Sequence, residues 1–416
     1  MITEAIILAG GLGTRLREVV PDLPKCMAPV AGRPFIAYVI DALRMQGIQH
    51  IILSLGYKSE VLVNYIKDYY PTLEYSVSIE DEPLGTGGAI QLALSKAAST
   101  DVVVANGDTL FSVDLPLLSG VHFSGGAECT LALKPMTHFS RYGVVETGNN
   151  KVVVAFREKQ QYEKGLINGG IYLINKEGFL ARGLPLKFSF EKDYLENFYP
   201  EEKFCASVQE GYFIDIGIPE DFQKAQGDLR RPQLDLSAID ATWTLFLDRD
   251  GVINEELPGT YVKTREEFSF NPGVLENVAP LARRFGRIVI VSNQRGIGKG
   301  LMSEEDLRDI HALMQTEIER AGGRMDAALH CPAVEPFAFC RKPNPGMAVR
   351  AREMFPAIEF PKSIMVGNKR SDMQFGRAAG MFTVFVTTTN DAAALGPGEA
   401  DMVFPDLAHF AQALQP

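Results

Sequence analysis

The sequence predicts an α/β protein of two domains, each built on a mostly parallel sheet with helices on both faces. Short apolar runs alternate with amphipathic segments in both halves of the chain, and such alternation is typical of parallel sheets. Glycine-rich or acidic segments directly follow several of these runs, at the sheet edge where α/β folds bind ligands. The length of 416 residues allows two or three domains that each bury a core.

The composition of the chain indicates which partners and which cellular environment to expect. A hydrophobic content of 46% with 22% charged residues is typical of soluble proteins. The net charge of −11 argues against a nucleic acid or an anionic membrane as partner. The five cysteines include no C-x-x-C pair, which favours reduced thiols over a disulfide framework. With no apolar run long enough to span a membrane and no signal peptide, we expect a cytoplasmic protein.

The first predicted strand, Ala5–Leu8, and the glycine-rich loop after it organise the first half of the chain. Glycines let backbone N–H groups surround phosphate oxygens where a Cβ atom would clash, and Arg15 adds a positive side chain. The alternative is the first turn of a dinucleotide-binding fold. Leu16 stands where that fingerprint needs its third glycine, so we prefer the phosphate loop.

The next elements continue the alternation of strands and helices. The predicted helices and strands are 35–45, 51–55, 60–69, 75–80 and 102–105, and a second glycine-rich turn, Gly85–Ala89, opens a further helix. Two aspartates then follow apolar runs directly, Asp108 after the last of these strands and Asp215 later in the chain. Each could be an ordinary turn residue. Two such carboxylates beside a phosphate loop instead favour a Mg²⁺ site.

Seven motifs of the first half occur in the order found in one enzyme family. They are Leu8–Leu16, Pro24–Lys25, Gly85–Ala89, Gly107–Asp108, Phe156–Lys159, Asn168–Gly170 and Asp215–Gly217. Together they resemble the sugar-1-phosphate nucleotidyltransferases over residues 1–226. The segment Phe188–Asp193 resembles the branch that acts on D-glycero-D-manno-heptose 1-phosphate.

The resemblance implies a role for each motif. Asp108 and Asp215 would hold Mg²⁺, and Lys25 would lie on the transferring phosphate. Catalysis would then consist of positioning and charge neutralisation at the α-phosphorus of a nucleoside triphosphate. The residues expected to hold the triphosphate are Leu8, Gly10, Gly11, Gly13, Thr14, Arg15, Gly85 and Thr86. Those expected to hold the sugar phosphate are Glu158, Lys159, Asn168 and Gly170.

Residues 227–242 show no clear period and are predicted to form a linker to a second domain, 243–416. That domain begins with a strand, 243–247, which ends in Asp248 and Asp250, two carboxylates that point the same way because they alternate. A calcium loop is the alternative, but such loops follow helices and need more oxygen ligands at fixed spacing. Two further predicted strands, 288–291 and 364–366, end in polar residues.

Four pieces of the second half, in their order, resemble the haloacid-dehalogenase (HAD) phosphatases: Asp248–Gly251, Ser292–Gln294, Arg341–Gly346 and Gly367–Asp372. Asp248–Gly251, Asn293–Ile297 and Cys340–Gly346 narrow the resemblance to the group that contains heptose-bisphosphate and histidinol-phosphate phosphatases. The resemblance implies that Asp248 attacks phosphorus and that Asp250 protonates the leaving group and then activates water. Ser292, Asn293, Arg341 and Lys342 would hold the substrate phosphate, and Asp248, Asp250, Asn368 and Asp372 would form the Mg²⁺ site. The gaps between these motifs leave no room for a cap domain, because the second contains a helix, Ser303–Ala321, with Ser303 as N-cap.

The second half departs from the family pattern in two places. Asn368 stands where the family has aspartate, so one metal ligand has lost its charge. Close relatives also carry a zinc-binding loop of cysteine and histidine before the lysine. Here only Cys331 and Cys340 fit that loop, and two thiolates do not close a structural zinc site, so we expect no zinc. His330 is then predicted to be a packing or surface residue.

The sequence therefore predicts a bifunctional enzyme that uses GTP, heptose phosphates and Mg²⁺. The second half would remove the 7-phosphate of D-glycero-D-manno-heptose 1,7-bisphosphate, and the first would join the 1-phosphate to GMP. One alternative is a hexose 1-phosphate nucleotidyltransferase fused to another sugar-phosphate phosphatase. Another is a second half that has become an inactive regulatory module because of Asn368.

Overall fold

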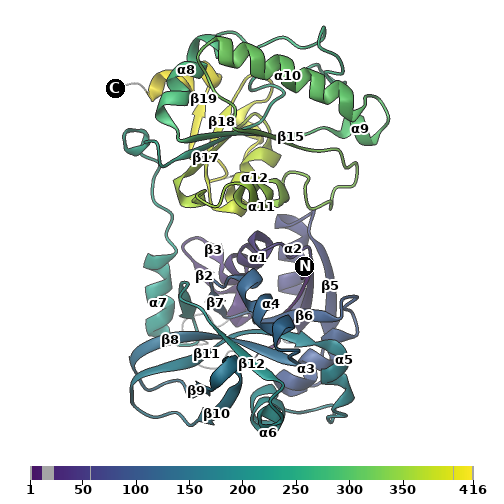
Figure 1. The fold of residues 1–416 in the computed structure, drawn as a ribbon, viewed down its shortest axis with the longest axis vertical. Helices are drawn as coiled ribbons and strands as arrows, with labels where there is room; N and C mark the ends of the chain where they lie inside the picture. The colour runs from purple at the N-terminus through teal and green to yellow at the C-terminus, as the bar shows by residue number, and fades with distance from the viewer. Residues whose placement is uncertain (1, 12–22, 57, 397, 415–416) are drawn as a thin grey trace. The chain divides into compact units, whose positions relative to one another are not determined.

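The computed structural model describes residues 2–11, 23–56, 58–396 and 398–414. The chain forms two compact units, Met1–Arg231 and Pro232–Pro416, each built around its own sheet (Figure 1). Both sheets are mainly or wholly parallel and have helices on both faces, which confirms the predicted fold class.

The sheet of the first unit has seven strands in the order β12-β8-β11-β6-β1-β4-β5. Only β11 runs antiparallel to its neighbours, β6 and β8. The strands are β1 (Glu4–Leu8), β4 (His50–Leu55), β5 (Glu74–Ile79), β6 (Asp101–Asn106), β8 (Cys129–Phe139), β11 (Tyr162–Asn175) and β12 (Phe204–Val208). Four of them lie within two residues of the predicted bounds.

Alternating residues of the interior strand β1 belong to separate cores on the two faces of this sheet. Ala5 and Ile7 pack in one cluster with helices α1 (Phe35–Met45) and α2 (Ser59–Tyr69). Ile6 packs in the other cluster with α3 (Gly85–Leu94) and α5 (Lys176–Ala181). Because both faces are covered, Ala5–Leu8 of this strand form an uninterrupted apolar run, as the sequence predicts.

The second unit has a fully parallel six-stranded sheet in the order β16-β15-β14-β17-β18-β19. The strands are β14 (Thr244–Leu247), β15 (Arg287–Asn293), β16 (Ala327–Cys331), β17 (Ser363–Gly367), β18 (Phe382–Val386) and β19 (Met402–Phe404). Figure 1 shows α8 (Val274–Arg284) and α10 (Glu304–Arg320) on one face, and α11 (Gly346–Met354) and α12 (Arg370–Ala379) on the other. Between β14 and β16 the described chain forms β15, three helices and loops but no inserted domain, in agreement with the prediction of a site without a cap.

Two local features refine the predictions. Helix α10 begins after Ser303, whose hydroxyl accepts a hydrogen bond from Asp306 N while the Asp306 side chain accepts one from Ser303 N. The segment predicted as a linker is only partly one. Helix α7 (Pro219–Asp228) extends into its start, and Leu234 and Ile239 are buried in the core of the second unit. Burial of apolar side chains in an adjacent core stabilises the folded state, so the end of a linker packs there.

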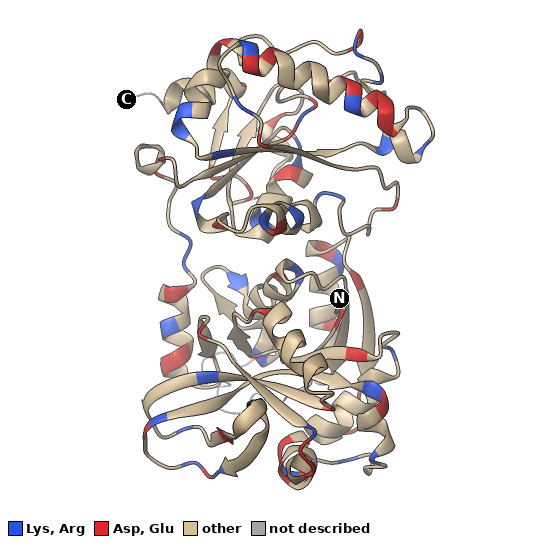
Figure 2. Ribbon diagram, viewed as in Figure 1, with Lys and Arg blue, Asp and Glu red and all other residues tan. Residues whose placement is uncertain are grey.

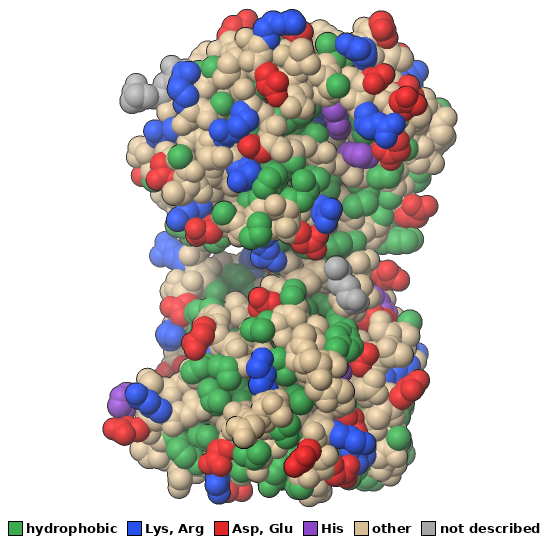
Figure 3. Space-filling view, viewed as in Figure 1, with side chains coloured by type: hydrophobic (Ala, Val, Ile, Leu, Met, Phe, Trp, Pro, Cys, Tyr) green, Lys and Arg blue, Asp and Glu red, His purple; other side chains and the backbone are tan. Residues whose placement is uncertain are grey.

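Charged residues are distributed over the surfaces of both units. In Figure 2, acidic and basic residues alternate along the same helices, for example along α10. Over the described part of the face in Figure 3, basic side chains stand among acidic and hydrophobic ones. None of the helices in the described ranges combines the length and apolar character needed to cross a membrane.

Candidate active sites

The first candidate site joins Lys25, Asp108 and Asp215, which are far apart in the sequence. Asp108 follows β6 and precedes β7 (Thr109–Phe111), and β7 pairs with β13 (Phe213–Asp215) so that Thr109 faces Asp215. Lys25 Nζ contacts Asp108 Oδ2 and lies 3.6 Å from Asp215 Oδ1. All three side chains are partly exposed, so a ligand can reach them.

Gly107 brings the end of β1 to this site. A Cβ atom at this position would lie 2.8 Å from Leu8 O, too close for any other residue. Gly107 N donates a hydrogen bond to the same carbonyl. The strand ends that carry Leu8 and Asp108 therefore meet. Gly10 and Gly11 follow at the start of the predicted phosphate loop, whereas Gly13, Thr14 and Arg15 lie outside the described residues.

The second glycine-rich turn contacts the segment that indicated a heptose substrate. Gly85 has a φ of +73°, and a Cβ atom there would lie 2.5 Å from Phe188 O. Thr86 Oγ1 donates to Glu191 Oε2 at 3.0 Å and accepts from Phe190 N at 2.9 Å. Thr86 thus has a structural role in connecting this turn to residues 188–193. Its contact with the nucleotide remains a prediction.

The predicted sugar-phosphate residues lie on β10 (Val153–Arg157) and β11. Glu158 and Lys159 are exposed just after β10 and form no ion pair in the described part of the chain. Asn168 accepts from Gly170 N at 3.1 Å and donates to Tyr172 Oη at 2.8 Å, where the strand register shifts. These contacts shape the strand, and binding of the sugar phosphate stays a prediction.

A cavity of about 280 Å³ adjoins Asp215. It is lined by the loop after β8 and by α7, including Arg141, Tyr142, Asp221 and Lys224. Burial and the neighbouring Asp215 raise the pKa of Tyr142 to about 12, so this side chain stays neutral. The cavity gives the carboxylate site an adjacent compartment lined by both polar and apolar side chains.

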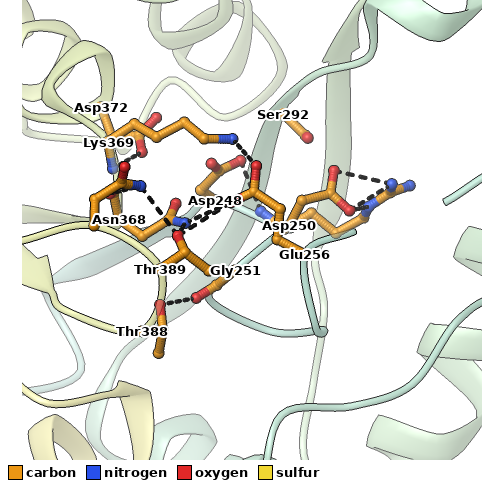
Figure 4. A network of polar contacts seen from close by, with 12 residues as sticks. Asp248, Asp250, Gly251, Glu256, Ser292, Asn368, Lys369, Asp372, Thr388 and Thr389 are labelled. Carbon is orange, nitrogen blue, oxygen red and sulfur yellow. Dashed lines mark hydrogen bonds and ion pairs between the residues drawn. The ribbon is translucent and has the colours of Figure 1, made fainter. Parts of the chain in front are cut away.

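The second candidate site lies at the carboxyl ends of β14 and β17 (Figure 4). Lys342 Nζ lies 2.9 Å from Asp248 Oδ1 and 2.7 Å from Asp372 Oδ1, and all three side chains are buried. Burial alone would lower the pKa of Lys342, but the two carboxylates outweigh it and raise the pKa. Burial and Asp248 raise the pKa of Asp372 to about 6 despite Lys342.

Asp250 is held in its ionised form by its neighbours. Arg249 Nη2 donates to Asp250 Oδ1 at 2.8 Å, and Gln294 Nε2 donates to Oδ2 at 2.8 Å. Burial would raise the pKa of Asp250, but Arg249 and the hydrogen bonds from Asn254 and Gln294 lower it below its usual value. In this state Asp250 is suited to accept a proton. To donate one, it needs the negative charge of a bound phosphate to raise its pKa.

The other predicted phosphate-binding residues surround Lys342. Ser292 is buried, and its hydroxyl accepts from Gln294 Nε2 at 2.8 Å. Asn293 exchanges two hydrogen bonds of 3.0 Å with the backbone of Lys342 and thereby positions the lysine. Arg341 donates to the carbonyl of Val334, so in this structure it stabilises a loop.

Asn368 supplies the evidence that a cation fits the second site. Its side chain is fully buried, and Oδ1 has no hydrogen-bond partner among the described residues. A buried amide oxygen without a partner is costly, and a hard cation would satisfy it. No group of three or more His, Cys, Asp or Glu side chains that could hold a metal occurs in the described ranges. A Mg²⁺ ion at either site would therefore need waters or substrate phosphate oxygens to complete its coordination.

The prediction that all cysteines are reduced thiols is wrong for one pair. Cys331 and Cys340 form a disulfide, with their Cα atoms 5.5 Å apart. Cys331 ends β16, and the loop after it folds back so that Gly346 N donates to Phe339 O. This tertiary contact brings the two thiols together. Cys26, Cys129 and Cys205 are free and buried, and His330 pairs with Glu304 at 2.9 Å at the surface.

Several residues around the second site were missed by sequence reasoning. Glu256, Lys369 and Thr389 surround Asn368 (Figure 4). Lys369 could have been noticed because it follows Asn368 directly. Glu256 and Thr389 lie in loops without any period, and no sequence pattern predicts that they meet.

A family model for nucleotidyl transferases matches residues 4–231, which is more than half of the chain. The chain belongs to the nucleotidyl transferase family. A D-glycero-alpha-D-manno-heptose 1-phosphate guanylyltransferase from Aneurinibacillus thermoaerophilus is 51% identical over 227 residues, 55% of this chain and 98% of that relative. The crystal structure of HddC from Yersinia pseudotuberculosis matches with 37% sequence identity and a TM-score of 0.50. The match spans 55% of this chain and all of the HddC chain.

In this nucleotidyl transferase, residues 339–410 match a second model, described as HAD-hydrolase-like. The crystal structure of a D,D-heptose 1,7-bisphosphate phosphatase from B. bronchiseptica is 31% identical with a TM-score of 0.38. The match spans 41% of this chain and 97% of the phosphatase chain. The chain thus combines a nucleotidyl transferase unit with a HAD-like unit.

Proposed function

We propose that the protein is a bifunctional enzyme of nucleotide-activated heptose synthesis. Residues 243–416 would hydrolyse the 7-phosphate of D-glycero-D-manno-heptose 1,7-bisphosphate. Residues 1–226 would transfer GMP from GTP to the resulting D-glycero-alpha-D-manno-heptose 1-phosphate, with 227–242 as the connecting segment. The observation that carries the proposal is that one chain contains a unit 51% identical to a heptose 1-phosphate guanylyltransferase and the buried Asp248–Lys342–Asp372 cluster.

Nucleotidyl transfer needs no general base, because the sugar phosphate is already an anionic nucleophile. A phosphate oxygen attacks the α-phosphorus of GTP, the bond to the bridging oxygen of the β-phosphate breaks, and pyrophosphate leaves. Lys25 lies between Asp108 and Asp215, where its ammonium can neutralise charge on the transferring phosphate. Asp108 and Asp215 would hold Mg²⁺, which supplies Lewis-acid stabilisation of the phosphate oxygens. The cavity beside Asp215 is large enough to take part of the sugar.

Phosphate hydrolysis would proceed through an aspartyl-phosphate. An oxygen of Asp248 attacks phosphorus, the bond to the C7 oxygen breaks, and Asp250 donates the proton to that oxygen. Asp250 then accepts a proton from water as the water attacks phosphorus and releases Asp248. Lys342 and Ser292 would hold the phosphoryl oxygens. The Asp248 carboxylate, the Asp250 carbonyl and Asn368 would hold Mg²⁺, which neutralises the phosphoryl charge.

The two activities would act in sequence on one sugar. Tethered enzymes raise the effective concentration of an intermediate near the second site without a sealed channel. The reaction order also sets the stereochemistry, because the phosphatase must prefer the anomer that the transferase uses. We further propose that the reactions take place in the cytoplasm, where GTP is available.

The test supplies each anomer of the bisphosphate to the intact protein with GTP and Mg²⁺ and follows GDP-heptose by mass spectrometry. The proposal requires release of inorganic phosphate and formation of GDP-heptose from the α anomer. It fails if the β anomer is hydrolysed faster or if no nucleotide sugar forms. A panel of four nucleoside triphosphates against heptose and mannose 1-phosphates separates the heptose function from the hexose alternative.

A further inference from the structure

The side-chain amide of Asn368 is held in one orientation by two oxygen acceptors. Asn368 Nδ2 donates to Glu256 Oε2 at 3.0 Å and to Thr389 Oγ1 at 2.5 Å (Figure 4). The Thr389 hydroxyl in turn donates its proton to Glu256 Oε2 at 3.1 Å, so its oxygen is left to accept from Asn368. In the reversed orientation the amide oxygen would face the Glu256 carboxylate, and it could accept from Thr389 only if that hydroxyl gave up its hydrogen bond to Glu256.

Glu256 is itself held in place beside the Asp248–Gly251 loop. Its Oε1 lies 2.6 Å from Lys369 Nζ, and this pair is only partly exposed. Gly251 allows the close approach, because a Cβ atom there would lie 2.0 Å from Asn368 Nδ2 and 3.1 Å from Glu256 Oε2. The carbonyl of Gly251 accepts a hydrogen bond from the hydroxyl of Thr388.

The orientation leaves Asn368 Oδ1 as the atom available to a cation. This oxygen is buried and has no hydrogen-bond partner among the described residues. Asn368 and Asp248 follow the neighbouring parallel strands β17 and β14, and Asp248 N donates to Val366 O at 3.0 Å. The unpartnered amide oxygen and the Asp248 carboxylate therefore belong to the same edge of the sheet.

We infer that Glu256 is a positioning residue of the metal site, which turns the Asn368 amide so that its oxygen coordinates the cation. An aspartate at position 368 would present an oxygen in either rotamer and would need no such partner. An asparagine presents an oxygen in one of two orientations, and the other places an N–H group against the cation. The carboxylate of Glu256 also adds negative charge next to a ligand that lacks it. This inference rests on the proposed phosphatase function.

The first experiment measures Mn²⁺ binding by electron paramagnetic resonance of the free ion. The full chain carries Asp215→Asn throughout, to remove the other candidate metal site. Glu256→Gln keeps the size of the side chain but can present either a donor or an acceptor to Asn368, so we expect Mn²⁺ to bind about tenfold more weakly. Glu255→Gln, which removes the same charge from the exposed neighbouring residue, is the matched control and should leave binding unchanged.

The second experiment repeats the measurement with Asn368→Asp. In this background Glu256→Gln should leave Mn²⁺ binding unchanged or strengthen it. The carboxylate introduced at position 368 presents an oxygen in either orientation, and the negative charge of Glu256 would repel that carboxylate. Equal weakening in both backgrounds, or no weakening in the asparagine background, would overturn the inference. Circular dichroism verifies folding of each variant, and Thr389→Val removes the second acceptor should Glu256→Gln fail to fold.

The two proposals fail in different ways. Mn²⁺ binding that depends on Glu256, without phosphate release from the bisphosphate, would refute the phosphatase function and keep the positioning role. Phosphate release from the bisphosphate, together with Mn²⁺ binding that does not depend on Glu256, would refute the positioning role and keep the phosphatase function.

Discussion

Lys342 Nζ lies 2.9 Å from Asp248 Oδ1, in a site where both side chains are buried. The lysine is also paired with Asp372 at 2.7 Å, so one ammonium is shared by two buried carboxylates. Removing one partner of a buried ionic cluster leaves uncompensated charge and is strongly destabilising. The contact thus serves stability as well as the proposed phosphate binding.

Lys342→Met should lower the stability of the second unit by about 3 kcal/mol and abolish phosphate release. Added Mg²⁺ should recover part of the lost stability, since a cation can replace the ammonium beside Asp248. Thermal unfolding with and without Mg²⁺ checks both effects. Lys362→Met, at a partly exposed position paired with Glu359 at 3.5 Å, should change neither stability nor activity.

Asp108→Asn or Asp215→Asn should abolish GDP-heptose formation from heptose 1-phosphate. Each substitution removes a charge from the proposed Mg²⁺ site, and the two units have separate cores. Phosphate release from the bisphosphate should therefore stay within a few-fold of the parent. Loss of both activities in a folded variant would show that the two sites depend on one another.

Asp248→Asn should abolish phosphate release and leave GDP-heptose formation intact. The amide is a poor nucleophile, so the bisphosphate would no longer be hydrolysed, while heptose 1-phosphate would still be converted to GDP-heptose. Coupled assays with each substrate on the same preparation distinguish the steps. If the variant hydrolysed the bisphosphate as fast as the parent, Asp248 could not be the nucleophile.

His311 should make the protein sensitive to acid. Burial lowers the pKa of this histidine from 6.5 to about 3, and Arg249 and His330 contribute. Because the unfolded chain takes up the proton first, stability falls as the pH drops below 6.5, by up to about 1.4 kcal/mol per pH unit. His311→Gln should show a smaller decrease in unfolding temperature between neutral pH and pH 5. His409→Gln, at an exposed position, should keep the pH dependence of the parent.

The disulfide should be detectable and modestly stabilising. Peptide mass spectrometry without reductant should find Cys331 linked to Cys340, with the mass lowered by two hydrogen atoms. A bridge across nine residues is expected to contribute about 2 kcal/mol, so dithiothreitol should lower the unfolding temperature. The Cys331→Ser/Cys340→Ser variant should not respond to dithiothreitol. Two unlinked peptides from protein handled without reductant would contradict the pairing.

Helices and strands were predicted well where one local pattern determines them. The helix 35–45 has the predicted bounds, and Ser303 caps α10 as its hydroxyl and the following periodicity indicate. The apolar runs of β1, β4, β14 and β17 could be recognised because strands buried on both faces need apolar residues at every position. The linker was harder to delimit, because Leu234 and Ile239 give no local sign that they join a core.

The proposed site residues, like the helices and strands, could be predicted where a local pattern marks them. Asp108, Asp248 and Asn368 could be named from the sequence because each follows a buried strand of a main sheet, and Asp215 because it ends the apolar run that forms β13. Parallel strands bring such positions to one sheet edge whatever their separation in the chain. The sequence alone thus determined two α/β units, the strand ends that carry the chemistry, and the asparagine in place of an acidic ligand.

Only the tertiary structure decided which loops meet at those strand ends. It joined Cys331 to Cys340, placed Lys342 between two carboxylates, and set Glu256 and Thr389 against the Asn368 amide. The physical reason is that a hydrogen bond or ion pair between loops depends on distances of a few ångströms, which are set by the packing of all the intervening elements. Local composition carries the preference of each segment for helix or strand, but it does not encode those distances.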